Sequence, residues 1–128
     1  MRIAQEDEQY LQAHLEYITD RETLDAYWYI VGFSESLLGF QPRPFRKGEV
    51  LDYRFFRNDE QWFAFIVNRN SLLFYFRSPA VRSGRYSKDE LMRELPEVSE
   101  NRRGEINTRI CTVMEARRVM TAVFSNKW

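Results

Sequence analysis

The segment at residues 61–79 constrains the fold most: two apolar runs, QWFAFIV and LLFYFR, flank the polar stretch NRNS at residues 68–71. The aromatic and β-branched content of both runs is typical of strands, and Asn and Ser favour a tight turn, so the segment predicts a β-hairpin. A sheet with one solvated face alternates apolar and polar side chains. Here both faces are apolar, and any fold must account for two apolar surfaces.

Alternation along each strand sorts these side chains by face. Trp62, Ala64 and Ile66 oppose Phe63, Phe65 and Val67, and Leu72, Phe74 and Phe76 oppose Leu73, Tyr75 and Arg77. Three arrangements are open. Helices can cover both faces, one face can stay partly open as a dimer or partner surface, or a small-ligand pocket can lie between sheet and helices, lined by Tyr27, Trp28 and the hairpin aromatics.

Helix starts are marked by capping boxes, in which a Ser or Thr is followed three residues later by Glu. Apolar spacing of three and four residues predicts a further helix near the start of the chain. The three boxes are Thr19…Glu22, Ser87…Glu90 and Thr112…Glu115. Helices are therefore expected over about 5–18, 20–38, 88–95 and 113–126.

Strands are expected at about 51–56, 61–68, 72–78 and 105–110. The segment GFQPRPFRKG (39–48) is interpreted as a connection, because Pro42 and Pro44 force extended backbone. The order α-α-β-β-β-α-β-α predicts one α+β domain over 1–128, an antiparallel meander with helices packed on the sheet. Residues 1–40 form its helical part, and residues 41–128 supply the sheet and two more helices.

Composition favours a globular protein in a reducing compartment. The 128 residues are 44% hydrophobic with no net charge, which does not fit disorder, and the single cysteine permits no internal disulfide. We see no signal peptide and no apolar run long enough to span a membrane, so a cytoplasmic location is expected.

The charge is distributed unevenly along the chain: residues 1–40 carry −6, residues 41–76 carry +2 and residues 77–128 carry +4. This asymmetry fits differently charged solvated faces, and it also fits an anionic partner on the C-terminal half.

From the hairpin onward the chain shows a short helix, the strand RGEINTRI and a final helix ending in RRVMTAVF. This part, residues 42–124, resembles the YdhG-like small bacterial domains, a largely uncharacterised family with a G-[TE]-I-x-x-x-[IL] strand before its last helix. Gly104, Glu105, Ile106 and Ile110 match that strand, whereas FQPRPF replaces a Trp-Gly-Met-Pro-like motif. The resemblance implies the fold and a cytoplasmic location, and it carries over no catalytic residue.

Candidate chemistry is sparse. His14 is the sole histidine and lies beside an apolar stripe, as a residue at the edge of a core does. Cys111 precedes the Thr112 cap, where a helix N-terminus can lower the pKa of a thiol, although small buried cysteines are also common there. The acidic residues of the N-terminal helices lack calcium-loop spacing. We therefore expect no catalytic residue, no metal and no cofactor.

Nucleic-acid binding is a second possibility. Phe63, Ala64, Phe65 and Ile66 fit the inner positions of an RNP1 motif, but Gln61-Trp62 replaces its basic-Gly opening, and the order of elements excludes an RNA-recognition fold. Basic loops at 77–85 and 102–103 can still meet phosphates. The residues that would do so are Arg82, Arg85, Arg102 and Arg103.

The sequence thus favours a small bacterial or phage protein without enzymatic activity that binds a protein partner or a second copy of itself. The candidate partner-binding residues are Trp62, Phe63, Phe65, Tyr75 and Arg77. Nucleic-acid association through the basic loops is the alternative, and metal handling or thiol chemistry a further one. No membrane partner is expected.

Overall fold

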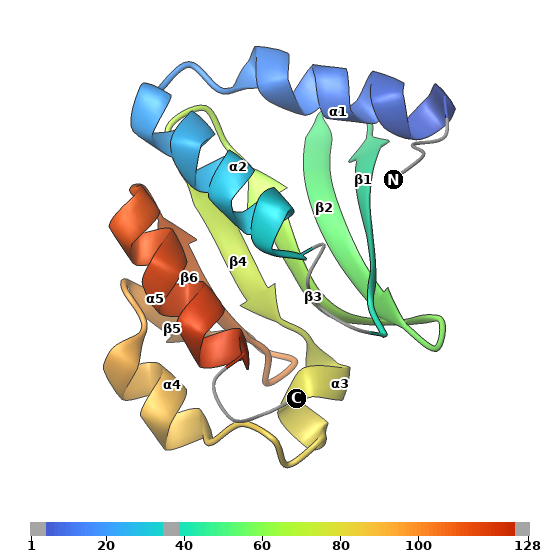
Figure 1. The fold of residues 1–128 in the computed structure, drawn as a ribbon. Coiled ribbons are helices and arrows are strands. Elements are labelled where there is room, and N and C mark those ends of the chain that lie inside the picture. Colours follow the sequence, from blue (N-terminus) through green and yellow to red (C-terminus); the bar gives the residue numbers. More distant parts are fainter. Residues whose placement is uncertain (1–4, 35–38, 125–128) are drawn as a thin grey trace.

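The computed structural model describes residues 5–34 and 39–124, which form an α+β domain with one antiparallel sheet (Figure 1). The predicted fold class is confirmed. The described elements are α1 (Gln5–Tyr17), α2 (Arg21–Ser34), β1 (Gln41–Lys47), β2 (Val50–Arg57), β3 (Glu60–Val67), β4 (Leu72–Phe76), α3 (Ser78–Arg82), α4 (Lys88–Glu94), β5 (Val98–Glu100), β6 (Ile106–Ile110) and α5 (Val113–Phe124). None of these helices is long and apolar enough to cross a membrane.

The strands lie in the order β1-β2-β3-β4-β6-β5, and every neighbouring pair is antiparallel. The predicted hairpin is confirmed: β3 and β4 pair with Val67 opposite Leu72, and the Asn68 amide donates to the Ser71 carbonyl at 2.9 Å. The connection expected at 39–48 is instead largely strand β1, at one edge of the sheet. Its two prolines suit an edge, where fewer backbone N–H groups are needed.

Helix caps decide where the helices begin. The Ser87 and Thr112 hydroxyls accept from the amides of Glu90 and Glu115, as predicted, and the Glu115 carboxylate accepts from the Cys111 amide at 2.8 Å. The first predicted cap is wrong by one residue. The Asp20 carboxylate accepts from the Thr23 amide at 3.0 Å, whereas the Thr19 hydroxyl donates to Asn70. Residues 35–38, the predicted end of the second helix, lie outside the described residues, as do 125 and 126 at the end of the last one.

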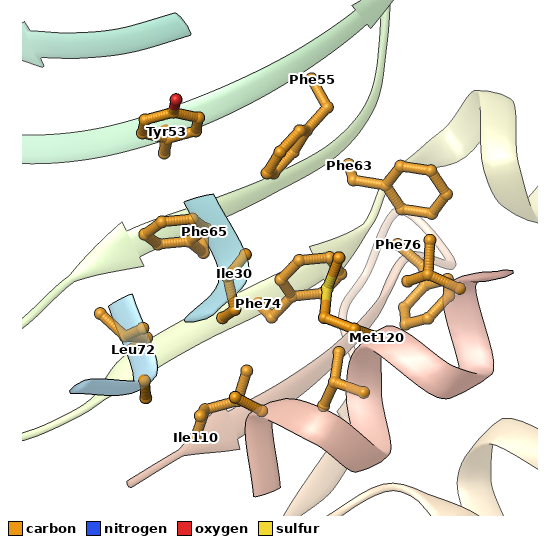
Figure 2. Close-up of a cluster of buried hydrophobic side chains, with 14 of the residues drawn as sticks. Ile30, Tyr53, Phe55, Phe63, Phe65, Leu72, Phe74, Phe76, Ile110 and Met120 are labelled. Atoms are coloured by element: carbon orange, nitrogen blue, oxygen red, sulfur yellow. The ribbon is translucent and has the colours of Figure 1, made fainter. Parts of the chain in front are cut away.

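One face of the sheet forms the hydrophobic core. In Figure 1, α2 and α5 lie across this face, and Figure 2 shows side chains of both helices meeting those of the central strands. Phe65, Leu72, Phe76, Ile106 and Ile110 are all 0% exposed. Fully burying a side chain of this size contributes roughly 1.5–3 kcal/mol, so this face supplies most of the stability of the domain.

A buried histidine fixes α1 to the rest of the fold. His14 is 0% exposed and lies 3.0 Å (Nδ1) from the Tyr27 hydroxyl and 2.8 Å (Nε2) from the Phe45 carbonyl. A carbonyl can only accept, so Nε2 carries the proton and Nδ1 accepts from Tyr27. Burial lowers the pKa of His14 below its ordinary value, which keeps the ring neutral. His14 is therefore a core residue rather than an edge residue.

Candidate functional site: the open face of the sheet

The other face of the sheet, here called the open face, carries no helix in residues 5–34 and 39–124. Strand register aligns its side chains in two rows across the strands. One row is Phe45, Asp52, Ile66, Leu73 and Arg109, and the next is Arg43, Arg54, Ala64, Tyr75 and Asn107. Ile66, Leu73 and Tyr75 remain partly exposed, whereas their neighbours Phe65, Leu72 and Phe74 are buried. Among the described residues one face of the sheet is thus left partly open, which is the geometry that the second arrangement above requires.

Arginine side chains surround this apolar centre. The Arg54 Nε lies 2.6 Å from an Asp52 carboxylate oxygen, and its guanidinium carbon lies 4.2 Å from the centre of the Phe45 ring. The Arg77 Nε lies 3.1 Å from Glu105, with the guanidinium carbon 5.9 Å from the Tyr75 ring centre. Both carboxylates are buried, so each arginine is held in place by a charge beneath it and a ring beside it.

The five predicted partner-binding residues do not lie on one face of the sheet in the structure. Tyr75 and Arg77 lie on the open face, as their positions in the strand required. Phe63 and Phe65 are 1% and 0% exposed on the covered face, so they are core residues and cannot contact a partner in this fold. Trp62 is the extra residue of a bulge opposite Phe55 and Phe56, and its ring packs edge-on against Phe40 at 6.0 Å. The open face therefore centres on Ile66, Leu73 and Tyr75.

A hollow of about 310 Å³ lies at one end of the open face. Phe56, Gln61, Arg77 and Glu105 line it together with Arg103. Arg103, expected in a nucleic-acid surface, thus lies beside Arg77, expected in a protein surface. The other arginines of the nucleic-acid alternative are also exposed: Arg82 ends α3, Arg85 follows it in a loop, and Arg102 adjoins Arg103 in the turn before β6. The expected basic loop at 77–85 is in part helical.

No family model matches this chain, and no curated protein or solved structure matches it either. The resemblance to the YdhG-like domains therefore stays a prediction.

The residues considered for catalysis or metal binding do not form a site on the open face. His14 is enclosed by Tyr27, Tyr53 and Phe45 and does not reach the surface. Burial and the carboxylates of Glu115 and Glu97 raise the pKa of the Cys111 thiol, opposite to the lowering that a helix N-terminus can cause. Among the described residues, no three His, Cys, Asp or Glu side chains are grouped to hold a metal.

The ligand pocket considered for the covered face does not form around Tyr27 and Trp28. Tyr27 is 0% exposed, with its ring against Tyr53 and Phe65, and Trp28 is 46% exposed on the surface of α2. Aromatic packing fills the space that a ligand would need. The open face is the stronger candidate site.

Sequence reasoning missed several residues of the open face, although the register of the hairpin could have found those on β3 and β4. A turn of residues 68–71 places Val67 opposite Leu72, which pairs Ile66 with Leu73 and Ala64 with Tyr75. Leu73 and Tyr75 share their face of the strand with the charged Arg77. This face is therefore the solvent side of the hairpin. Phe45 and Arg54 required knowledge of β1, which the two prolines concealed. Arg109 required the pairing of β6 with β4, a contact between distant parts of the chain.

Proposed function

We propose that this protein is a non-catalytic binding protein, and that the open face is its partner-binding surface. The observation that carries the proposal is the placement of the helices. In the described part of the chain, α2 and α5 cover one face, α1 contacts the edge strand β1 and pairs Asp7 with Arg43, and the other face keeps partly exposed apolar side chains at its centre (Figure 1). Apolar surface of this kind, with polar groups around it, is typical of protein interaction sites.

The composition of the open face supports a protein partner. Interface centres are enriched in aromatic residues and arginine and contain few lysines. Arg54 and Arg77 lie beside Phe45 and Tyr75 on the open face, and the one lysine on its strands is Lys47 at the end of β1. We further propose that the protein works in a bacterial cytoplasm, where a single free cysteine stays reduced.

Site-specific photo-crosslinking tests the proposal directly. A photoreactive amino acid replaces Leu73 on the open face, and in a matched variant it replaces the exposed Glu90 on α4. We expect a discrete covalent adduct after irradiation in cells for position 73 and none for position 90. Mass spectrometry of the adduct shows whether the partner is another protein or a second copy of this chain. Equal labelling at the two positions, or none at either, would contradict the proposal.

Nucleic-acid association is the second candidate, supported by the exposed positions of Arg82, Arg85, Arg102 and Arg103. Phosphate contacts dominate such binding and weaken steeply with salt. A mobility shift at low salt that is lost in the Arg102→Gln/Arg103→Gln variant would support it. The absence of any shift at low salt would exclude it.

A further inference from the structure

We propose that the partner presents an acidic surface to the open face, with carboxylates that bind Arg54, Arg77 and Arg109 around the apolar centre formed by Ile66 and Leu73. This inference rests on the proposed function and adds the chemistry of the partner. Three observations lead to it: the charge balance of the face, the way its arginines are held, and the rings beside them.

The charge balance of the open face is positive. It carries five cations, Arg43, Lys47, Arg54, Arg77 and Arg109, against four carboxylates that pair with the arginines, Asp7, Asp52, Glu105 and Glu97. The whole chain has no net charge, so the remaining surface is negative to the same extent. An acidic partner is therefore guided to the open face rather than to the acidic helices α1 and α2.

Arg54 and Arg77 are prepared to bind a second anion. Each meets its own carboxylate through Nε, at 2.6 and 3.1 Å, and their side chains are 26% and 29% exposed. A guanidinium group has five N–H donors, and the outer pair fits a carboxylate in a bidentate manner. Since the inner contact and the adjacent ring already fix the side chain, little rotamer entropy is lost when a partner binds.

Arg109 provides a weaker and exchangeable contact. Its Nη1 donates to the Ser71 hydroxyl at 2.8 Å, and its Nε lies 3.7 Å from the carboxylate of Glu97. The side chains of this pair are 44% and 70% exposed, so the pair contributes little on its own. A carboxylate of the partner can replace Glu97 without leaving a buried charge unpaired.

Asp52 adds a requirement for a hydrogen-bond donor. Its Oδ2 meets Arg54, but the buried Oδ1 has no hydrogen-bond partner among the described residues. A buried acceptor without a donor costs free energy. A peptide N–H or a side-chain donor that the partner brings to this strand can satisfy Oδ1 while Arg54 keeps its contact with Oδ2.

The rings of the open face favour an acidic protein over single-stranded nucleic acid. Sequence-tolerant binding of single strands relies on bases stacking on free aromatic faces. Here the guanidinium of Arg54 lies over the Phe45 ring, and that of Arg77 lies near the Tyr75 ring. A base would have to displace an arginine that a buried carboxylate holds, whereas a carboxylate binds the arginine where it is.

The test compares three labelled probes by fluorescence anisotropy: a peptide of alternating glutamate and leucine, its lysine–leucine counterpart, and single-stranded oligothymidylate. We expect the glutamate peptide to bind at least about tenfold more tightly than the lysine peptide, and to lose affinity as salt is raised.

Variants of the protein test the role of each arginine. Arg109→Gln should weaken binding of the glutamate peptide several-fold. Arg54→Lys, which keeps the charge and removes the planar fork, should also weaken it. Arg93→Gln removes an exposed cation from α4 and should leave binding unchanged.

The outcomes separate the two proposals. Equal binding of both peptides, or tighter binding of oligothymidylate than of the glutamate peptide, would overturn the acidic-partner inference. If the glutamate peptide does not bind while the photo-adduct still forms at position 73, the charge inference fails and the proposed function stands. If neither signal appears, both fail.

Discussion

Within the β3–β4 hairpin, the two faces of the sheet carry similar apolar side chains, but only one of these faces is buried. Phe65 and Leu72 on the covered face are 0% exposed, whereas Ile66 and Leu73, their immediate neighbours in the chain, stay partly exposed. The polar groups at the borders of the two faces differ as well. The covered face is bordered by the neutral His14, and the open face by arginine–carboxylate ion pairs. Apolar content alone therefore does not reveal which face is core. The arrangement of charges around it does.

The sharpest test of this difference uses two adjacent leucines of β4. Leu72→Asn places an amide in the core and leaves a cavity, and we expect a loss of about 4 kcal/mol or more in the free energy of unfolding. Leu73→Asn changes the open face, and a loss of about 1 kcal/mol is expected. Urea denaturation followed by circular dichroism measures both. Similar losses would mean that the open face is covered in solution.

A second comparison lies within the open face itself. Arg77→Gln leaves the buried Glu105 carboxylate without its cation, and we expect the free energy of unfolding to fall by about 2–3 kcal/mol. Arg109→Gln breaks an exposed pair and should cost less than about 0.5 kcal/mol. The same denaturation experiment distinguishes the two. An equal, small cost for both would show that Arg77 is not held by Glu105.

The histidine at the border of the covered face predicts a pH effect. Because the pKa of His14 is lowered in the fold, the unfolded chain takes up a proton more readily below about pH 6.5. Stability should be complete above that value and fall toward pH 5, by at most about 1.4 kcal/mol per pH unit. His14 is the single histidine, so His14→Gln serves as the control. This slope should vanish in the variant, and its persistence there would assign it to other groups.

The sequence predicted what depends on neighbouring residues and missed what depends on tertiary packing. The Ser87 and Thr112 caps, the hairpin and the alternation of its faces follow from local rules. Strand β1 was missed because Pro42 and Pro44 are unusual in strands, and three-residue β5 because it is too short for alternation to show. The openness of one face could not be predicted, since it depends on α2 and α5 packing on the same side. Because the helices cover the face that carries Phe63 and Phe65, these two residues belong to the core and not to the candidate site.

The two edges of the sheet limit how the protein can assemble. At one edge, Pro42 and Pro44 reduce the supply of backbone donors, and His14 occupies the Phe45 carbonyl. At the other edge, β5 has only three residues. Neither edge offers a long template for an additional strand, so the sheet resists fibril growth even though its chain is rich in aromatic residues. The partly exposed apolar face is thus bordered by edges to which further strands of other copies add poorly.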